Sequence, residues 1–293
     1  MKRFFALFFV LLEMTIFAET WNYEMQKITI PTGKPEDEIL VEKAAKEDML
    51  DVGPTEFQID EEENIYILDR RKIKKFDENG NYLNSTSETD LVIYSFVVHN
   101  NMIWAICGDH LNQVFLRRFS DECELIDTHQ IENRKSSLEI NQSGNVGLRL
   151  SYDSFLEFSP DNDKLEMKET KFLKDVIFDF SAYQNKQDII FLKNNERLDL
   201  KVLWPNAVGF HFSGLDAEGN LYFELFTAEH DSEIGIISNE ANVYETNIKL
   251  PNFNKFGLDF GKGIDYFIST DGDVYQMIPM TDKIEIRKWK RMD

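Results

Sequence analysis

Several residue patterns that mark common enzyme classes are missing from this 293-residue chain. It has no G-x-S-x-G elbow, no phosphate-binding P-loop and no dinucleotide fingerprint, which argues against serine hydrolases, ATPases and NAD enzymes. Its five histidines lack the paired spacing of typical zinc ligands. Beyond the N-terminal segment, no run of residues is apolar enough to span a bilayer. These absences point away from the common catalytic classes.

Cysteine is nearly absent, with only Cys107 and Cys123 in the chain. An exported chain could pair them. However, Cys107 ends a strand-like run (IWAIC) and Cys123 lies beyond the next run, so a simple hairpin would not set the two opposite each other. We expect two unpaired thiols, and a disulfide is the alternative.

Positive charge is scarce as well, because 32 Lys and Arg stand against 53 Asp and Glu and the formal net charge is −21. Such a chain repels nucleic acid and anionic membrane surfaces. We therefore expect no nucleic-acid partner. Hydrophobic residues make up 42% of the chain, which is enough to build a large folded core.

The N-terminal segment has the order of features found in export signals. Lys2 and Arg3 precede an apolar run from Phe4 to Leu12, and Ala18 precedes polar residues. We expect residues 1–18 to be a cleaved signal peptide and the mature protein to be periplasmic or secreted. The alternative is a retained membrane anchor, but Glu13 interrupts the apolar run, and a carboxylate within a membrane span costs ~2.5 to 3.5 kcal/mol.

Residues 19–293 contain a repeated pattern, in which an apolar residue is followed six positions later by another, with a polar or glycine-containing turn between them. The pairs are Ile59 and Ile65, Val97 and Ile103, Ile140 and Val146, Tyr183 and Ile189, Leu215 and Leu221, and Ile268 and Val274. A third strand-like run follows each pair, and often a fourth. Repeats of roughly 42 residues with four short strands are typical of β-propeller blades.

The repeats predict an all-β fold, a single six-bladed β-propeller of four-stranded antiparallel blades. The sixth repeat lacks a fourth strand, and Met25 to Ile30 can supply it beside Ile284 to Trp289, closing the ring. We expect the loss of residues 19–31 to be damaging and the loss of Arg291 to Asp293 to matter little.

Two segments depart from the repeat. The fourth repeat is short, because WPNAVG replaces its outer strand. Residues 31–54 are predicted to be an insertion that is partly helical, since Pro35 precedes three acidic residues as in a first helical turn.

The stretches IDEEENIYILD, FDENG and LDAEGNLYF resemble the repeats of the NHL family of six-bladed propellers. The resemblance is clear in the first and fifth repeats and partial in the third and sixth. It implies a ring-shaped scaffold that binds protein, peptide, glycan or small ligands. Related six-bladed folds also include some lyases and lactonases.

Loops that join strand two to strand three, and blade to blade, lie on one face of a propeller and surround the mouth of its central channel. Several arginines there could hold an anionic ligand, although ordinary solvated loop charge is the favoured interpretation. The candidate ligand-binding residues are Arg70, Arg71, His110, Arg134, Tyr152, Asp153, Arg197, Trp204, His230 and Phe256.

Closely spaced oxygen ligands at Asp77 to Asn81 and Asp271 to Asp273 would suit calcium. Turn formation explains both stretches more simply, as it does for Asp60, Asn141 and Asp216, which recur with the repeat. We expect no cofactor, with calcium as the alternative, and we predict no metal ligand and no catalytic residue.

The sequence favours an exported, monomeric, non-catalytic binding scaffold whose partner is a protein, a peptide or a small anionic ligand. The alternative is a divalent-metal-dependent enzyme, similar to a lactonase or lyase, with its ion in the channel.

Overall fold

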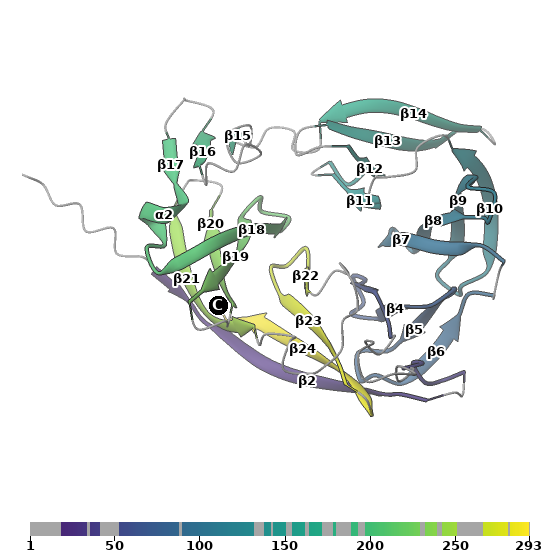
Figure 1. Ribbon diagram of the computed structural model, residues 1–293, viewed down its shortest axis with the longest axis horizontal. Helices are drawn as coiled ribbons and strands as arrows, with labels where there is room; N and C mark the ends of the chain where they lie inside the picture. The colour runs from purple at the N-terminus through teal and green to yellow at the C-terminus, as the bar shows by residue number, and fades with distance from the viewer. Residues whose placement is uncertain are drawn as a thin grey trace, which may run out of the picture.

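The structure is a computed structural model in which β-sheets stand around a common axis (Figure 1). It describes residues 19–33, 36–41, 53–87, 90–131, 138–141, 143–150, 154–161, 164–171, 178–179, 189–192, 197–228, 232–238, 242–250, 266–280 and 282–292. The predicted signal peptide, residues 1–18, lies outside this part of the chain and stays a prediction. Within the described residues, no helix has the length and apolarity needed to cross a membrane.

Blades one to three are antiparallel meanders, each formed by one continuous stretch of chain. Blade one contains β3 (Glu56–Ile59), β4 (Ile65–Asp69), β5 (Lys72–Phe76) and β6 (Tyr82–Ser85). Blade two contains β7 (Val92–His99), β8 (Met102–Gly108), β9 (Val114–Ser120) and β10 (Leu125–Ile131). Blade three contains β11 (Leu138–Ile140), β12 (Val146–Arg149), β13 (Ser154–Asp161) and β14 (Lys164–Lys171).

Blades four and five each take in a strand from the N-terminus. Blade four contains β18 (Ala207–Leu215), β19 (Leu221–Thr227), β20 (Ser232–Ile237) and β21 (Val243–Leu250), with β1 (Glu19–Trp21) added in parallel at its outer edge. Blade five contains β22 (Tyr266–Ile268), β23 (Val274–Pro279), β24 (Lys283–Arg291) and β2 (Tyr23–Pro31).

The fourth repeat of the sequence does not form a four-stranded blade in the described residues. It contributes a small three-stranded sheet of β15 (Phe178–Asp179), β16 (Ile189–Leu192) and β17 (Arg197–Asp199), followed by the helix α2 (Leu200–Leu203). In the described part of the chain the ring therefore has five blades, four of them four-stranded and one extended to five strands by β1, and the prediction of six is wrong. The six-bladed ring that the NHL resemblance implied is not found.

Five hydrophobic clusters, one at each junction between neighbouring blades, show how the ring closes without a sixth blade. Phe155 of blade three belongs to the same buried cluster as Phe212 and Phe223 of blade four. The other clusters join blades five and one, one and two, two and three, and four and five. Leu200 and Trp204, at the end of the fourth repeat, fill the core of blade four instead of extending another blade.

Burial follows the position of a strand within its blade. The second strand of blade one, β4, has the sequence IYILD and is buried along its whole length, because neighbouring blades cover both of its faces. The outer strand β10, LIDTHQI, is mostly exposed or half-buried. The inner strands contact one another around the axis, β22 with β3, β3 with β7, and β7 with β11.

The first hairpins of blades one and four contain the same hydrogen-bond network. In blade one, the Asp60 carboxylate accepts from the Asn64 backbone N–H (2.8 Å), the Asn64 side chain (2.9 Å) and the Tyr66 hydroxyl (3.0 Å). In blade four, Asp216 accepts from Asn220 (2.9 and 2.7 Å) and Tyr222 (3.1 Å) in the same way. The expectation that these aspartates form turns is confirmed.

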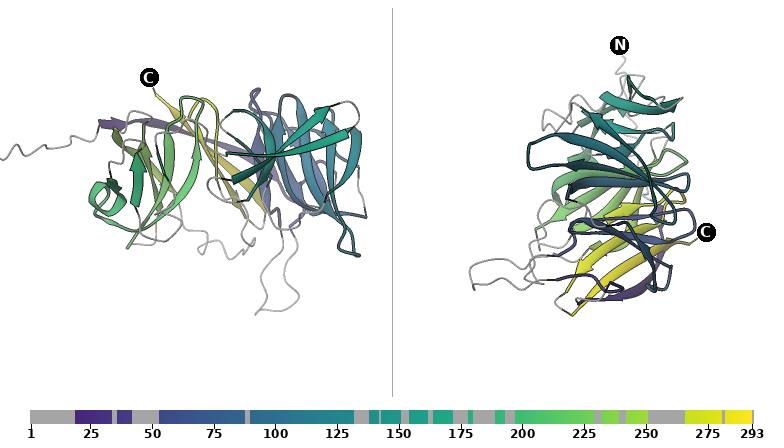
Figure 2. Two further views of the ribbon diagram at one scale, coloured as in Figure 1. Left: turned by 90° about the horizontal axis from the view of Figure 1, so that it is seen from above. Right: turned by 90° about the vertical axis from the view of Figure 1, so that its right-hand side faces the viewer.

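The closing strand predicted from the sequence is present. β2 pairs antiparallel with β24 along its full length, with Met25 opposite Trp289, Ile28 opposite Ile286 and Ile30 opposite Ile284. Ile30 is fully buried between blades five and one, whereas Met25 is exposed. The early strand β2 and the last strand β24 thus lie side by side in one blade (Figure 2).

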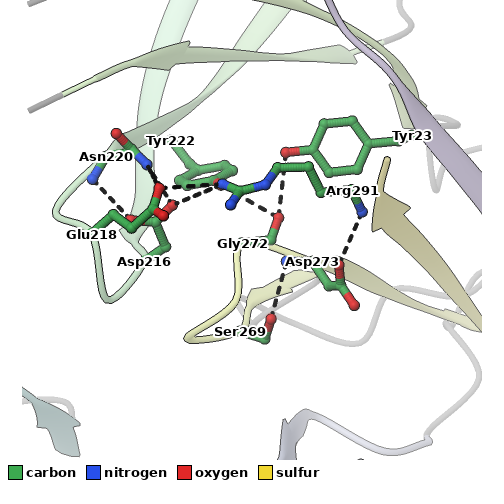
Figure 3. Close-up of polar contacts among 9 residues, drawn as sticks. All are labelled: Tyr23, Asp216, Glu218, Asn220, Tyr222, Ser269, Gly272, Asp273 and Arg291. Atoms are coloured by element: carbon green, nitrogen blue, oxygen red, sulfur yellow. Dashed lines mark hydrogen bonds and ion pairs between the residues drawn. The ribbon is translucent and has the colours of Figure 1, made fainter. Parts of the chain in front are cut away.

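Arg291 joins this closure to blade four, and its contacts are a reason to expect that the loss of Arg291 matters more than the sequence suggested (Figure 3). Its guanidinium lies 4.8 Å from the centre of the Trp21 ring, and its Nη1 is 3.5 Å from Glu218 and 3.8 Å from Asp216. Its backbone N–H donates to Asp273 (3.0 Å). Burial raises the pKa of the neighbouring Tyr23 hydroxyl to about 12, so this group stays protonated and can donate to the Gly272 carbonyl.

Two further expectations can be compared with the structure. Cys107 and Cys123 are both free and buried, and they lie toward opposite ends of blade two, which is too far apart for a disulfide. In the insertion, Glu36 and Asp37 form a turn and Ile39 bridges to Thr32. Residues 42–52 lie outside the described part, so a helix there stays a prediction.

Candidate functional site

The inner strands, which stand around the axis of the ring, carry polar side chains in all five blades. We call the side of the ring on which each inner strand begins, where the chain crosses from blade to blade, the crossover face. Glu56 and Tyr266 are the first residues of their inner strands, and Glu139 is the second residue of its strand. The set, which we call the inner polar belt, consists of Glu56, Ser95, Glu139, Arg149, His211, Ser213 and Tyr266.

Glu56, Ser95 and Leu138 link blades one, two and three near the axis. The Ser95 hydroxyl (3.2 Å) and the Phe96 backbone N–H (3.3 Å) both donate to the Glu56 carboxyl group. The Leu138 backbone N–H in turn donates to the Ser95 oxygen (3.3 Å). One serine hydroxyl therefore connects the inner strands of three blades.

The carboxyl group of Glu56 is 6% exposed, which makes its charged form unfavourable. Burial, reinforced by the negative charge of Glu139, raises the pKa of Glu56 to about 8, although the bonds from Ser95 and Phe96 act in the opposite direction. Glu56 is therefore mainly neutral at pH 7, and the polar belt carries one negative charge less than its sequence suggests.

Arg149 of blade three contacts blade four and so connects the polar belt across this junction. Its Nη1 lies 3.0 Å from the Glu139 carboxylate on the neighbouring strand. Its guanidinium also lies 5.8 Å from the centre of the Phe212 ring in blade four. This arrangement places one positive and one negative charge side by side at the axis.

His211, Ser213 and Tyr266 form a hydrogen-bonded group between blades four and five. Nδ1 of His211 is 2.9 Å from the Tyr266 hydroxyl, to which Ser213 donates (3.1 Å). Desolvation lowers the pKa of His211; Arg149 lowers it further, and Glu224 opposes the change. When the Tyr266 hydroxyl donates to Nδ1 of His211, the neutral imidazole carries its proton on Nε2.

The structure places the ten residues predicted from sequence differently. Arg70 and Arg71 form the exposed turn between β4 and β5, and His110 lies in the exposed turn between β8 and β9. Both turns are on the crossover face, as expected. Arg197 is in β17. Arg134, Tyr152, Asp153, His230 and Phe256 lie outside the described residues, and a binding role for them stays a prediction.

Trp204 is not at the mouth of the ring. It is 4% exposed and packs in the core of blade four, where its indole covers Gly235 so closely that a Cβ there would lie 2.5 Å from the ring. Its apolar surface is more stable inside this core than on a solvated loop, which corrects its predicted place.

Metal ligands do not converge in the described part of the chain, where no group of three or more His, Cys, Asp or Glu side chains could hold an ion. At Asp77, one carboxylate oxygen accepts from the backbone N–H groups of Asn79 and Asn81, and the other accepts from the Asn81 side chain. In the last blade, the Ser269 hydroxyl accepts from the Asp273 N–H within the turn. The Asp77 oxygens thus form a turn, whereas the Asp273 carboxylate accepts from the Arg291 N–H and lies 3.5 Å from Lys288.

None of the residues of the inner polar belt is among the ligand-binding residues predicted from the sequence, because that prediction considered the loops and not the strands. A signal was present, since Glu56 begins β3 and Glu139 stands between Leu138 and Ile140 in β11. A charged residue in an inner strand is unusual unless it has a partner.

No protein-family model and no curated protein sequence matches the chain. A chain of the mitotic checkpoint complex is similar in structure, with a TM-score of 0.45 and 10% identity, over 89% of this chain and 96% of that chain. Hsv2 of Kluyveromyces marxianus has a TM-score of 0.42 and 11% identity, over 77% and 69%. A gluconolactonase from Xanthomonas campestris has a TM-score of 0.37 and 10% identity, over 94% and 87%. The propeller assignment therefore rests on the sheets and their cores, and these similarities support no functional conclusion.

Proposed function

We propose that the mature chain is an exported, non-catalytic binding module that holds its ligand on the inner polar belt. The observation that carries this proposal is the presence of polar side chains on the inner strands of all five blades, beside the apolar clusters at the blade junctions. A closed ring of sheets holds such groups rigidly, which lowers the entropic cost of binding.

Export is supported by the charged, apolar and small-residue order of residues 1–18. Strand β1 begins at Glu19, directly after the predicted cleavage point. The ring can therefore close with residues that all remain after cleavage. No observation among the described residues favours the metal-dependent alternative.

The test uses the full chain with a C-terminal tag, recovered from the exported fraction of the expressing cells. We expect N-terminal sequencing to start at Glu19, and native mass spectrometry to show a bound ligand. The double variant Arg149→Gln with His211→Ala should lose that ligand while its melting temperature stays close to that of the wild type. Recovery of the uncleaved chain from the cytosol would contradict export, and equal ligand occupancy in the double variant would contradict binding at the belt.

A further inference from the structure

One buried acceptor at the junction of blades four and five has no donor in the protein. Gln276 is 1% exposed, and its Oε1 lacks a hydrogen-bond partner. Buried side-chain acceptors nearly always have a partner, and a group without one calls for an explanation. Such a position is commonly completed by a water molecule or a ligand.

Gln276 belongs to the same group as His211, Ser213 and Tyr266. It lies directly opposite Tyr266 in the ladder of β22 and β23, so the two side chains are on the same face of blade five. That face packs against blade four, because Val274, two residues before Gln276, shares a cluster with Tyr222 of blade four. His211 and Ser213 reach Tyr266 from that blade.

The four side chains of this group carry no net charge at neutral pH. Ser213, Tyr266 and Gln276 are uncharged, and the lowered pKa of His211 keeps its imidazole neutral. Two charged side chains act on the pKa of His211, and they are of opposite sign, Glu224 and Arg149. The chain as a whole carries a formal charge of −21, which opposes the approach of an anion.

We propose that this group, the blade four–five site, binds a neutral ligand that offers a hydrogen-bond donor next to an acceptor, as a vicinal diol or a peptide amide does. The donor of the ligand would form a hydrogen bond to Oε1 of Gln276, and its acceptor would receive a hydrogen bond from Nε2–H of His211. This inference rests on the proposed function and specifies its ligand. It replaces the small anionic ligand expected from the sequence.

The test follows the His211 Cε1–H resonance by NMR, assigned with the variant His211→Gln, while three probes are added separately. The probes are mannitol, N-acetylglycine N-methylamide and sodium acetate. We expect a saturable shift with a neutral probe and none with acetate beyond the effect of the same concentration of NaCl. A response to mannitol identifies a hydroxyl ligand, and a response to the amide identifies a peptide group.

Two variants test whether the response comes from this group. Tyr266→Phe and Gln276→Leu should each weaken binding of the active probe by about ten-fold, the effect of losing a hydrogen bond in a partly buried site. Gln276→Leu removes an acceptor that has no partner, so it should fold as well as the wild type. Tyr82→Phe is the matched control, because it removes a tyrosine–serine contact of the same length (3.1 Å) in blade one.

A stronger response to acetate, no response to either neutral probe, or unchanged binding in both variants would overturn the proposal. If the neutral probes fail while the Arg149 and His211 double variant still loses its captured ligand, the binding function stands and the blade four–five site falls. If the double variant keeps its ligand while a neutral probe binds, the reverse holds.

Discussion

The side chain of Glu56 lies where three blades meet, and its protonation is controlled by that position. The free carboxyl group titrates near 4.5, and burial raises its pKa to about 8. Between these values the folded protein holds a proton that the unfolded chain has released. The free energy of unfolding must therefore fall as the pH rises through this window, and the loss is complete above pH 8.

The variant Glu56→Gln is expected to keep its free energy of unfolding as the pH rises. Glutamine cannot ionise, and it keeps an acceptor for Ser95 or Phe96. Relative to the wild type, the variant should be more stable by roughly 3 to 5 kcal/mol at pH 8 and nearly equal at pH 4.5. Urea unfolding at the two pH values measures the difference, with Glu61→Gln on an exposed turn as the control. A difference that does not change with pH would show that Glu56 is not protonated in the folded state.

Strand β2 is the element that makes the ring continuous, and it packs on two blades at once. Ile30 is buried in the cluster between blades five and one, and Tyr23 in the cluster between blades four and five. Its partner β24 ends at Arg291, which contacts Trp21, Glu218 and Asp216. The two ends of the chain therefore stabilise three of the five blades.

Deletion of residues 19–31 is expected to open the ring and expose the edge of β24. Loss of two buried side chains alone, at ~1.5 to 3 kcal/mol each, is a large part of the ~5 to 15 kcal/mol that stabilises a typical domain. The truncated protein should melt much earlier and aggregate, because exposed edges pair with other chains. Thermal melts with light scattering test this, and a monomer with an unchanged melting temperature would refute the closure.

Two truncations at the C-terminus distinguish the contribution of Arg291 to stability from that of the two residues after it. Removal of Met292 and Asp293 should lower the melting temperature slightly, since the ladder between β2 and β24 stays complete. Removal of Arg291 as well should lower it several degrees further, because Trp21 and Glu218 lose their cationic partner. Equal melting temperatures for the two truncations would show that the Arg291 contacts in Figure 3 do not stabilise the closure.

The acidic excess of the whole molecule is −21 in formal net charge. On the face opposite the crossover face, the hairpin turns include exposed carboxylates at Glu61, Glu62, Glu78 and Glu122. Repulsion among like charges destabilises a compact state, and salt screens it. Ion pairs such as Lys288 with Glu63, at 2.7 Å, are weakened by the same screening.

Because acidic residues outnumber basic ones, we expect the repulsion among carboxylates to affect stability more than the attraction within ion pairs. The melting temperature should rise by a few degrees between low and physiological ionic strength. Differential scanning fluorimetry in a NaCl series at pH 7 measures it. A melting temperature that falls with salt would show that ion pairs such as Lys288–Glu63 outweigh the repulsion.

The sequence by itself determined the local structure. The spacing of Ile59 and Ile65, and of Leu215 and Leu221, predicted hairpins, because alternation and turn formation depend on neighbouring residues. It also predicted the closing strand, since the last repeat lacked one. The tertiary structure alone decided that the ring has five blades, because this depends on whether Phe155 packs against Phe212 across a gap of many residues. It likewise decided that Trp204 is buried, that Glu56 meets Ser95 and that Arg149 meets Phe212, since side chains from different blades come together only when the ring closes.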